Sequence, residues 1–77
     1  MTILYFASLA DHAGRREESV DAQSATASSI YDDARLRHGF PFGIDKLRVA
    51  VNGAFVGWDS TVNDGDEIVF IPPVSGG

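Results

Sequence analysis

The last residues of the chain contain the groups that could do chemistry. An apolar run ends at Pro72-Pro73, and Val74-Ser75-Gly76-Gly77 follows. Both prolines lack a backbone N–H and have a fixed φ, so a strand cannot continue through them, and Pro73 also favours an extended Pro72. The glycines have no Cβ and could enter a narrow channel. Residues 72–77 could reach about 20 Å, so we expect an extended tail that holds the terminal carboxylate away from the folded body.

A free carboxylate is a poor acyl donor at neutral pH. Adenylation with ATP by another protein would turn the carboxylate of Gly77 into a good electrophile. A sulfur donor could then form a thiocarboxylate, or an amine could form an amide. Both uses require a tail that can enter the sites of two successive partners. The alternative interpretation is an ordinary frayed terminus.

Other candidates for chemistry are few. His12 and His38 are not spaced with carboxylates as metal ligands are, so we expect surface or helix-end roles. Residues 64–67 (Asp-Gly-Asp-Glu) are too short for a calcium loop and are typical of a hairpin turn. No nucleophile motif or glycine-rich phosphate loop is present, and Trp58 is expected at the rim of the core. We therefore expect no catalytic residues of the chain's own, no metal and no bound cofactor.

The composition restricts the class of protein. The 77 residues are 44% apolar and 22% charged, which fits one small globular domain without a membrane span or an evident signal peptide. The absence of cysteine excludes disulfides and thiolate chemistry and favours a cytoplasmic setting. The net charge of −5 disfavours binding to nucleic acid and favours a partner with a basic docking surface.

The hydrophobic pattern predicts five strands. The first is apolar on both alternating faces, which predicts a central strand covered on both sides, and the connection after it turns at Gly14. Asn52-Gly53 is typical of a tight hairpin, and Asp64-Gly65 marks another turn. The expected strands are residues 3–8, 15–21, 47–51, 54–56 and 67–71.

One stretch, residues 26–38, has helical periodicity. Its expected buried stripe comprises Ala27, Ile30, Tyr31, Ala34 and His38. Thr26 is the expected N-cap of this helix, with Ser24 as the alternative. Gly39 is expected to be the C′ residue, directly after the end of the helix. Phe40 and Phe42 should then cover the open end of the core.

The order β-β-α-β-β-β indicates an α+β domain with a mixed sheet and one crossing helix. In a β-grasp (ubiquitin-like) arrangement the first and last strands are adjacent and parallel, although the order alone also permits other small α+β folds.

The chain resembles the small subunit of molybdopterin synthase, a ubiquitin-like sulfur carrier of the MoaD/ThiS family. The resemblance extends from Ile3-Leu4-Tyr5-Phe6-Ala7 through Ala13-Gly14-Arg15, the helix and Val51-Asn52-Gly53. Its most specific parts are residues 64–67 and 71–77. The resemblance implies one β-grasp domain over residues 1–77, with residues 72–77 as the tail.

The resemblance also implies roles for particular residues. Gly77 would be adenylated and then thiocarboxylated, and Gly76 would share its narrow channel. The rest of the tail would follow the path into the partner: Pro72, Pro73, Val74 and Ser75. Phe6, Phe55 and Ile71 would form an apolar docking face, although ordinary core or scattered surface positions are the alternative.

The partners follow from the same resemblance. They would be the large subunit of molybdopterin synthase, in a two-plus-two heterotetramer, an adenylating enzyme similar to ubiquitin-activating proteins that uses ATP, and a sulfurtransferase. The carrier would donate sulfur to a cyclic pterin in molybdenum cofactor biosynthesis, and the large subunit would contain the active site.

Two features depart from the family pattern. The helix region is rich in small residues, namely Ala25, Ala27, Ser28 and Ser29, and Ile71 stands where an aromatic residue is also common. Three other functions stay open: a sulfur carrier for thiamine, cysteine or another thiolated product, a ubiquitin-like modifier conjugated to lysines, and a plain binding module. Because Lys46 is the only lysine, a modifier could form self-chains through one position at most.

Overall fold

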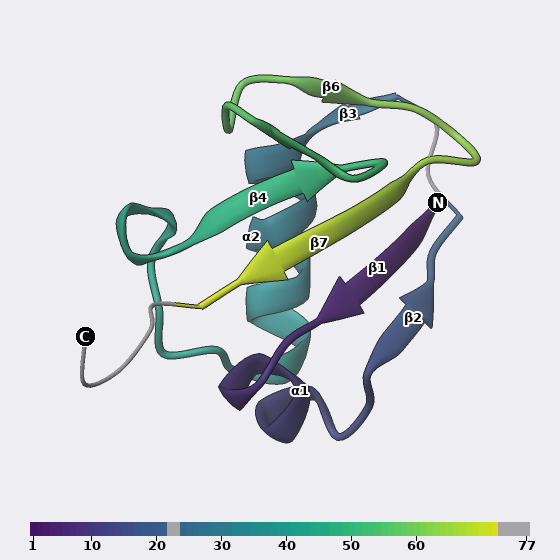
Figure 1. Ribbon diagram of the computed structural model, residues 1–77. Helices are drawn as coiled ribbons and strands as arrows, with labels where there is room; N and C mark the ends of the chain where they lie inside the picture. The colour runs from purple at the N-terminus through teal and green to yellow at the C-terminus, as the bar shows by residue number, and fades with distance from the viewer. Residues whose placement is uncertain (22–23, 73–77) are drawn as a thin grey trace.

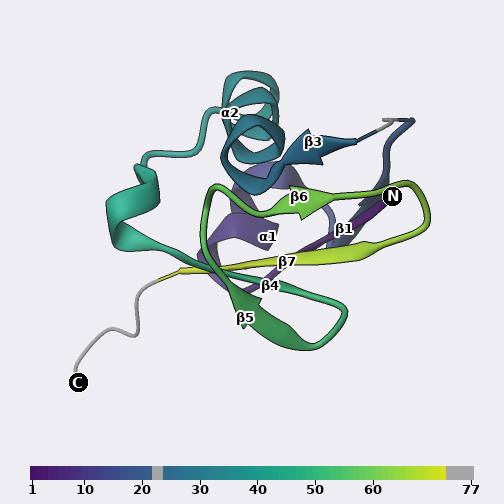
Figure 2. The same ribbon diagram turned by 90° about the horizontal axis from the view of Figure 1, so that it is seen from above.

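The computed structural model describes residues 1–21 and 24–72. Their main feature is a five-stranded mixed sheet in the order β2-β1-β7-β4-β5, with α2 across one face (Figures 1 and 2). The elements are β1 (Thr2–Tyr5), α1 (Ser8–Ala13), β2 (Glu17–Ser19), β3 (Ala25–Thr26), α2 (Ala27–His38), η1 (Ile44–Lys46), β4 (Arg48–Val51), β5 (Ala54–Val56), β6 (Thr61–Val62) and β7 (Glu67–Ile71). Strands β1 and β7 are parallel, and the other neighbours are antiparallel. The predicted α+β class and the parallel pairing of the first and last main strands are confirmed.

Helix α2 forms as the sequence predicted. Its N-cap is Thr26, whose Oγ1 accepts a hydrogen bond from the backbone N–H of Ser29 at 3.3 Å. Gly39 ends the helix in the left-handed conformation, at φ 71°. Four of the five predicted stripe residues are buried and His38 is half-buried, so the stripe faces the sheet.

The predicted first strand is too long. Strand β1 ends at Tyr5, and α1 begins at Ser8, in the stretch where we expected the end of a strand and a simple connection. Leu9 is fully buried, and this burial holds the short helix against the core. Gly14 is the predicted turn residue, and it ends α1 at φ 73° with its N–H donating to the carbonyl of Ala10. Six residues are too few to show a helical period in sequence.

Several short elements were also not predicted. Strands β3 and β6 pair as a separate two-residue ribbon beside the start of α2, and η1 forms one turn before β4. Strand β2 covers only residues 17–19 of the predicted 15–21. The two predicted turns are correct: Asn52 and Gly53 have φ of 51° and 87°, and Asp66 N–H donates to the Asn63 carbonyl across Asp64-Gly65.

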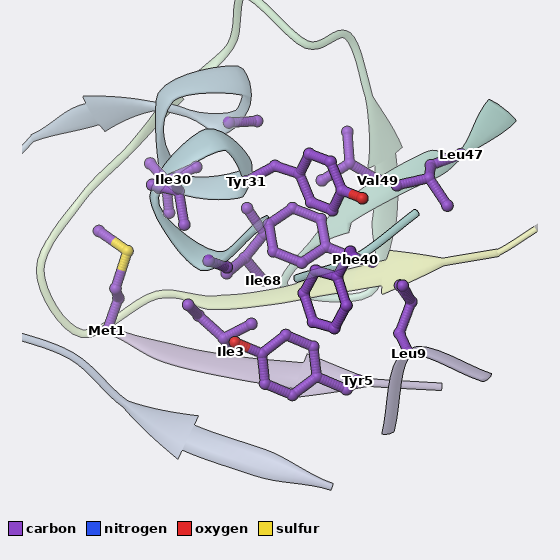
Figure 3. Close-up of a cluster of buried hydrophobic side chains, with 14 residues drawn as sticks. Met1, Ile3, Tyr5, Leu9, Ile30, Tyr31, Phe40, Leu47, Val49 and Ile68 are labelled. Carbon is purple, nitrogen blue, oxygen red and sulfur yellow. The ribbon is translucent and has the colours of Figure 1, made fainter. Parts of the chain in front are cut away.

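The core lies between α2 and the sheet (Figure 3). Phe70 and Tyr31 are fully buried there, with ring centroids 5.1 Å apart. Phe40 is buried and Phe42 packs half-buried beside it, so these residues cover the end of the core as predicted. Trp58 is half-buried at the rim and stacks on Phe70 at 6.0 Å, which confirms its expected position.

Within residues 1–21 and 24–72, no helix has the length and apolar character needed to cross a membrane.

Candidate functional site

The tail begins at the end of β7. This strand lies between β1 and β4, and it ends at Ile71, followed by a buried Pro72. The candidate tail residues Pro73, Val74, Ser75, Gly76 and Gly77 lie outside the described residues. In the described part of the chain, the tail therefore starts at the end of the middle strand of the sheet.

An apolar row crosses the face of the sheet opposite α2, which we call the open face. Leu4 is paired with Val69, Val69 with Ala50, and Ala50 with Phe55. Directly paired residues point to the same side of a sheet, so these four side chains form one line across β1, β7, β4 and β5. Phe55, at the end of the row, is 69% exposed.

The three predicted docking residues lie in or next to this row. Phe55 belongs to it, Ile71 follows Val69 by two positions on β7, and Phe6 follows Leu4 by two positions along the chain. Phe6 is 52% exposed and Ile71 is half-buried. The expectation that the first strand is covered on both sides is therefore wrong for the described residues. Its second apolar set, Leu4 and Phe6, lies on the side away from α2.

Two hollows lie at neighbouring strand ends, one at the start of the tail and one at the end of β1, whose Tyr5 pairs with Phe70 of β7. The first, which we call the tail-root hollow, has a volume of about 470 Å³, and its lining includes Lys46, Arg48, Phe55, Trp58, Ile71 and Pro72. The second, the β1 hollow, has a volume of about 480 Å³ and is lined by Leu4, Phe6, Asp11 and Arg16 among others. The proposed docking residues thus divide between them: Phe55 and Ile71 line the first, and Phe6 lines the second.

The Asp-Gly-Asp-Glu motif lies at the other end of β7. The side chain of Asp66 accepts hydrogen bonds from Asn52 Nδ2 at 3.0 Å and from the Asn63 backbone N–H at 2.9 Å. These two bonds lower the pKa of Asp66, and the bond from the Asn63 backbone has the larger effect. The Glu67 N–H donates to Asn52 Oδ1 at 3.0 Å. The motif therefore joins the hairpin of Asn52 to the start of β7, and its role in the described structure is to hold two turns together.

A second polar cluster lies on the helix side of the sheet, around Glu18 of edge strand β2. Its Oε1 accepts a hydrogen bond from the Tyr5 hydroxyl at 2.7 Å, and its Oε2 accepts one from Arg37 Nη1 at 2.6 Å. His38 Nε2 lies 3.2 Å from Oε1. Burial alone would raise the pKa of Glu18, but the bonds from Arg37, Tyr5 and His38 outweigh it and lower that pKa to about 2.

This cluster joins the edge of the sheet to the end of α2. Arg37 also donates from Nε to Asp33 at 2.9 Å, and the bond to Glu18 raises the pKa of its guanidinium further. Burial and the bond to Glu18 raise the pKa of Tyr5. An inward charge on an edge strand also discourages pairing with another sheet. The cluster therefore has a structural role, because its hydrogen bonds connect β2 to β1 and to the end of α2.

The two histidines make separate contacts and do not share a metal site. His38 belongs to the cluster around Glu18, and exposed His12 lies at the edge of the Phe40 ring, with centroids 6.4 Å apart. Among the residues with described positions, no group of three His, Cys, Asp or Glu side chains could hold a metal ion.

Sequence reasoning missed part of the open face. Leu4, Ala50 and Val69 complete the row, and Arg48 and Lys46 border it. The apolar positions on both faces of residues 3–6 were the available signal, but we interpreted them as burial on two sides.

Comparisons with known proteins identify the family of the chain. The ThiS family matches residues 3–77. The molybdopterin synthase sulfur carrier subunit of Escherichia coli is 32% identical over 97% of this chain and 96% of its own length. The protein of that name from Haemophilus influenzae is 31% identical over 100% and 99%.

Solved structures share the fold. SAMP1 from Haloferax volcanii, small archaeal modifier protein 1, is 32% identical with a TM-score of 0.81, over 99% of this chain and 97% of that one. A putative molybdopterin converting factor subunit 1 from Pyrococcus furiosus is 29% identical with a TM-score of 0.77, over 95% of both chains. These likenesses confirm the β-grasp fold. With its full-length match to the ThiS family and to two sulfur carrier subunits, the chain belongs to the family of ubiquitin-like sulfur carriers.

Proposed function

We propose that this sulfur carrier serves molybdopterin synthesis, with Gly77 as the group that is adenylated and then converted to a thiocarboxylate. The observation that carries the proposal is the full-length similarity, at 31–32% identity, to two molybdopterin synthase sulfur carrier subunits. In this proposal the large subunit of the synthase supplies the active site, and the carrier supplies sulfur to a cyclic pterin. ATP is consumed by a separate adenylating enzyme, and a sulfurtransferase provides the sulfur.

The geometry supports a docking role for the open face. The row from Leu4 to Phe55 lies on the same sheet whose middle strand leads into the tail. A partner that covers this row would lie next to the start of the tail, because the row crosses β7 at Val69 and the tail follows Ile71, two residues later. Exposed aromatic side chains of this kind are the usual anchors of protein interfaces.

The chemistry is tested by the intact mass of the chain purified from its own cells under mild, non-acidic conditions. A fraction heavier by one oxygen-to-sulfur exchange, mapped to Gly77, is the expected result. Incubation with ATP, the activating enzyme and a sulfur donor should increase that fraction. A chain that never gains sulfur in this incubation would contradict the proposal.

The site is tested by deletion of Gly77. The shortened chain should keep its fold, measured by its circular dichroism and thermal unfolding, and should fail to restore cofactor synthesis in cells that lack the protein. Restoration by the shortened chain would refute the role of Gly77.

The docking face is tested separately with Phe55→Arg. We expect its dissociation constant for the large subunit to rise about thirtyfold or more, since exposed aromatic anchors contribute roughly 2 kcal/mol or more. Leu36→Arg is the matched control, because Leu36 is 87% exposed on α2, away from the open face. Equal binding by both variants would remove Phe55 from the interface.

A protein modifier is the second candidate. Its support is the 32% identity to small archaeal modifier protein 1 of Haloferax volcanii. In this case Gly77 would be joined to lysines by an amide bond. Mass spectrometry of the cellular proteins would then find lysines joined by an amide bond to the C-terminal peptide of this chain, which after trypsin begins at Val49 because Arg48 is the last Lys or Arg. The absence of such branched peptides under conditions where the carrier is sulfurated would exclude this function.

A further inference from the structure

Some of the positively charged side chains of this acidic chain are paired with carboxylates, and others are not. Arg37 and Arg15 pair with carboxylates, and Arg35 Nε donates to the Phe40 carbonyl at 3.2 Å. The three remaining cations, Arg16, Lys46 and Arg48, form no ion pair with any residue in 1–21 or 24–72. Lys46 and Arg48 line the tail-root hollow, and Arg16 lines the β1 hollow.

Lys46 and Arg48 are concentrated in one hollow. The tail-root hollow contains these two cations and one anion, Asp45, whereas the whole chain has a net charge of −5. Arg48 is paired with Ile71 across β4 and β7, so its side chain leaves the sheet on the open face. Both cations are exposed. The local charge is thus opposite in sign to the charge of the chain.

These cations need partners once the open face is covered. An exposed Lys or Arg is well solvated in the free domain, but a charge that loses its water in an interface without an opposite charge is strongly destabilising. The guanidinium of Arg also presents a planar set of donors that matches a carboxylate. A partner that buries Phe55 and Ile71 must cover or border the neighbouring Arg48, because all three line one hollow.

A phosphate of a small substrate fits this position less well than a protein carboxylate. The hollow lies at the root of the tail, and six residues of extended chain can place the carboxylate of Gly77 about 20 Å away. The hollow also exposes the apolar side chains of Phe55, Trp58 and Ile71, as expected of a surface that packs against a protein.

We propose that the large subunit of molybdopterin synthase presents carboxylates to Lys46 and Arg48 in the tail-root hollow when it receives the tail. These contacts orient the partner on the open face and steer its approach, so they select the correct partner. Net charge alone favoured a basic docking surface, whereas the distribution of charges favours an acidic one at this place. The inference rests on the proposed function, since it assigns the chemistry of the surface that docks there.

The test uses the full-length chain and the molybdopterin synthase large subunit of the same organism. Binding of the wild type is compared with that of Lys46→Gln/Arg48→Gln across a series of salt concentrations, by surface plasmon resonance or calorimetry. The control is Leu36→Glu/Thr61→Glu, two exposed positions on α2 and β6. Both double variants lower the net charge by two, from −5 to −7, so they have the same net charge and place the change at different sites. Circular dichroism of each variant verifies its fold.

We expect the Lys46/Arg48 variant to bind on the order of tenfold more weakly at low salt, mainly through slower association, and to lose much of the salt dependence of the wild type. The control should retain both the salt dependence and most of the affinity. If both variants bind alike, or if the Lys46/Arg48 variant keeps the wild-type salt dependence, the inference is overturned while the proposed function stands. If the wild type itself does not bind the large subunit, the proposed partner is wrong and the inference falls with it.

Discussion

The strongest stability prediction concerns Glu18 and the link between β2 and α2. The substitution Glu18→Gln removes the negative charge of the carboxylate, whose oxygens accept hydrogen bonds from Tyr5 and Arg37. The side chain of Glu18 is only 12% exposed, so solvent screens these contacts little. A pKa lowered from 4.5 to about 2 corresponds to about 3 kcal/mol of stability at neutral pH. Such a loss is a large share of the ~5–15 kcal/mol typical of a domain.

The sign of the pH dependence follows from the lowered pKa. A carboxylate whose pKa is lower in the folded state stabilises the fold above its unfolded pKa, and this contribution disappears as the pH falls through the folded pKa. The stability difference between wild type and Glu18→Gln should therefore be full at pH 6–7 and should shrink between about pH 4.5 and 2.

The assay is urea unfolding of both proteins at several pH values, followed by circular dichroism. Glu17→Gln is the matched control, because Glu17 is an exposed neighbour on the same strand and its side chain makes no hydrogen bond or ion pair with another described residue. The control should unfold close to the wild type. The reasoning would be refuted if Glu18→Gln and Glu17→Gln lost equal stability at pH 7, or if the loss for Glu18→Gln did not change between pH 5 and pH 2.

Three further predictions concern other contacts. Leu9→Ala should lower the free energy of unfolding by about 2–5 kcal/mol, since Leu9 is fully buried in α1; a loss in urea unfolding as small as that of a surface substitution would contradict this. Asn52→Gly keeps the positive φ of the turn but removes the amide that bonds Asp66 and the Glu67 N–H, so thermal unfolding should show a loss of about 1–2 kcal/mol. An unchanged melting temperature would exclude a stabilising role for this amide. Tyr31→Phe removes the 2.6 Å hydrogen bond to the Phe42 carbonyl and should cost about 1 kcal/mol in chemical denaturation, whereas equal stability would indicate that water replaces the hydroxyl.

The elements that sequence could predict are those with long or unambiguous patterns. Helix α2 has a periodic stripe and a capping residue, and the turn at Asn52-Gly53 follows directly from residues that tolerate positive φ. Helix α1 is too short for its period to be visible, and its position depends on the burial of Leu9 in a core formed by distant segments.

The candidate site likewise has residues that the sequence could predict and an arrangement that it could not. Phe6, Phe55 and Ile71 were identified through a family resemblance, but the row that connects them depends on the register of four strands. Glu18 lies in residues 15–21, for which the sequence predicted a strand but no contact of this side chain. Its contact with Arg37, 19 residues away in sequence, arises from the packing of α2 on the sheet.

The position of β7 has a mechanical consequence. Force applied to Pro72 along the axis of β7 acts on a strand that is hydrogen-bonded to β1 on one side and to β4 on the other. Such a pull loads both ladders in shear, so many bonds resist together instead of breaking one after another as in peeling. Under the proposed function, a partner that draws the tail into a narrow channel would therefore pull on the strand that is paired on both sides, and the domain would resist deformation while the tail enters and leaves.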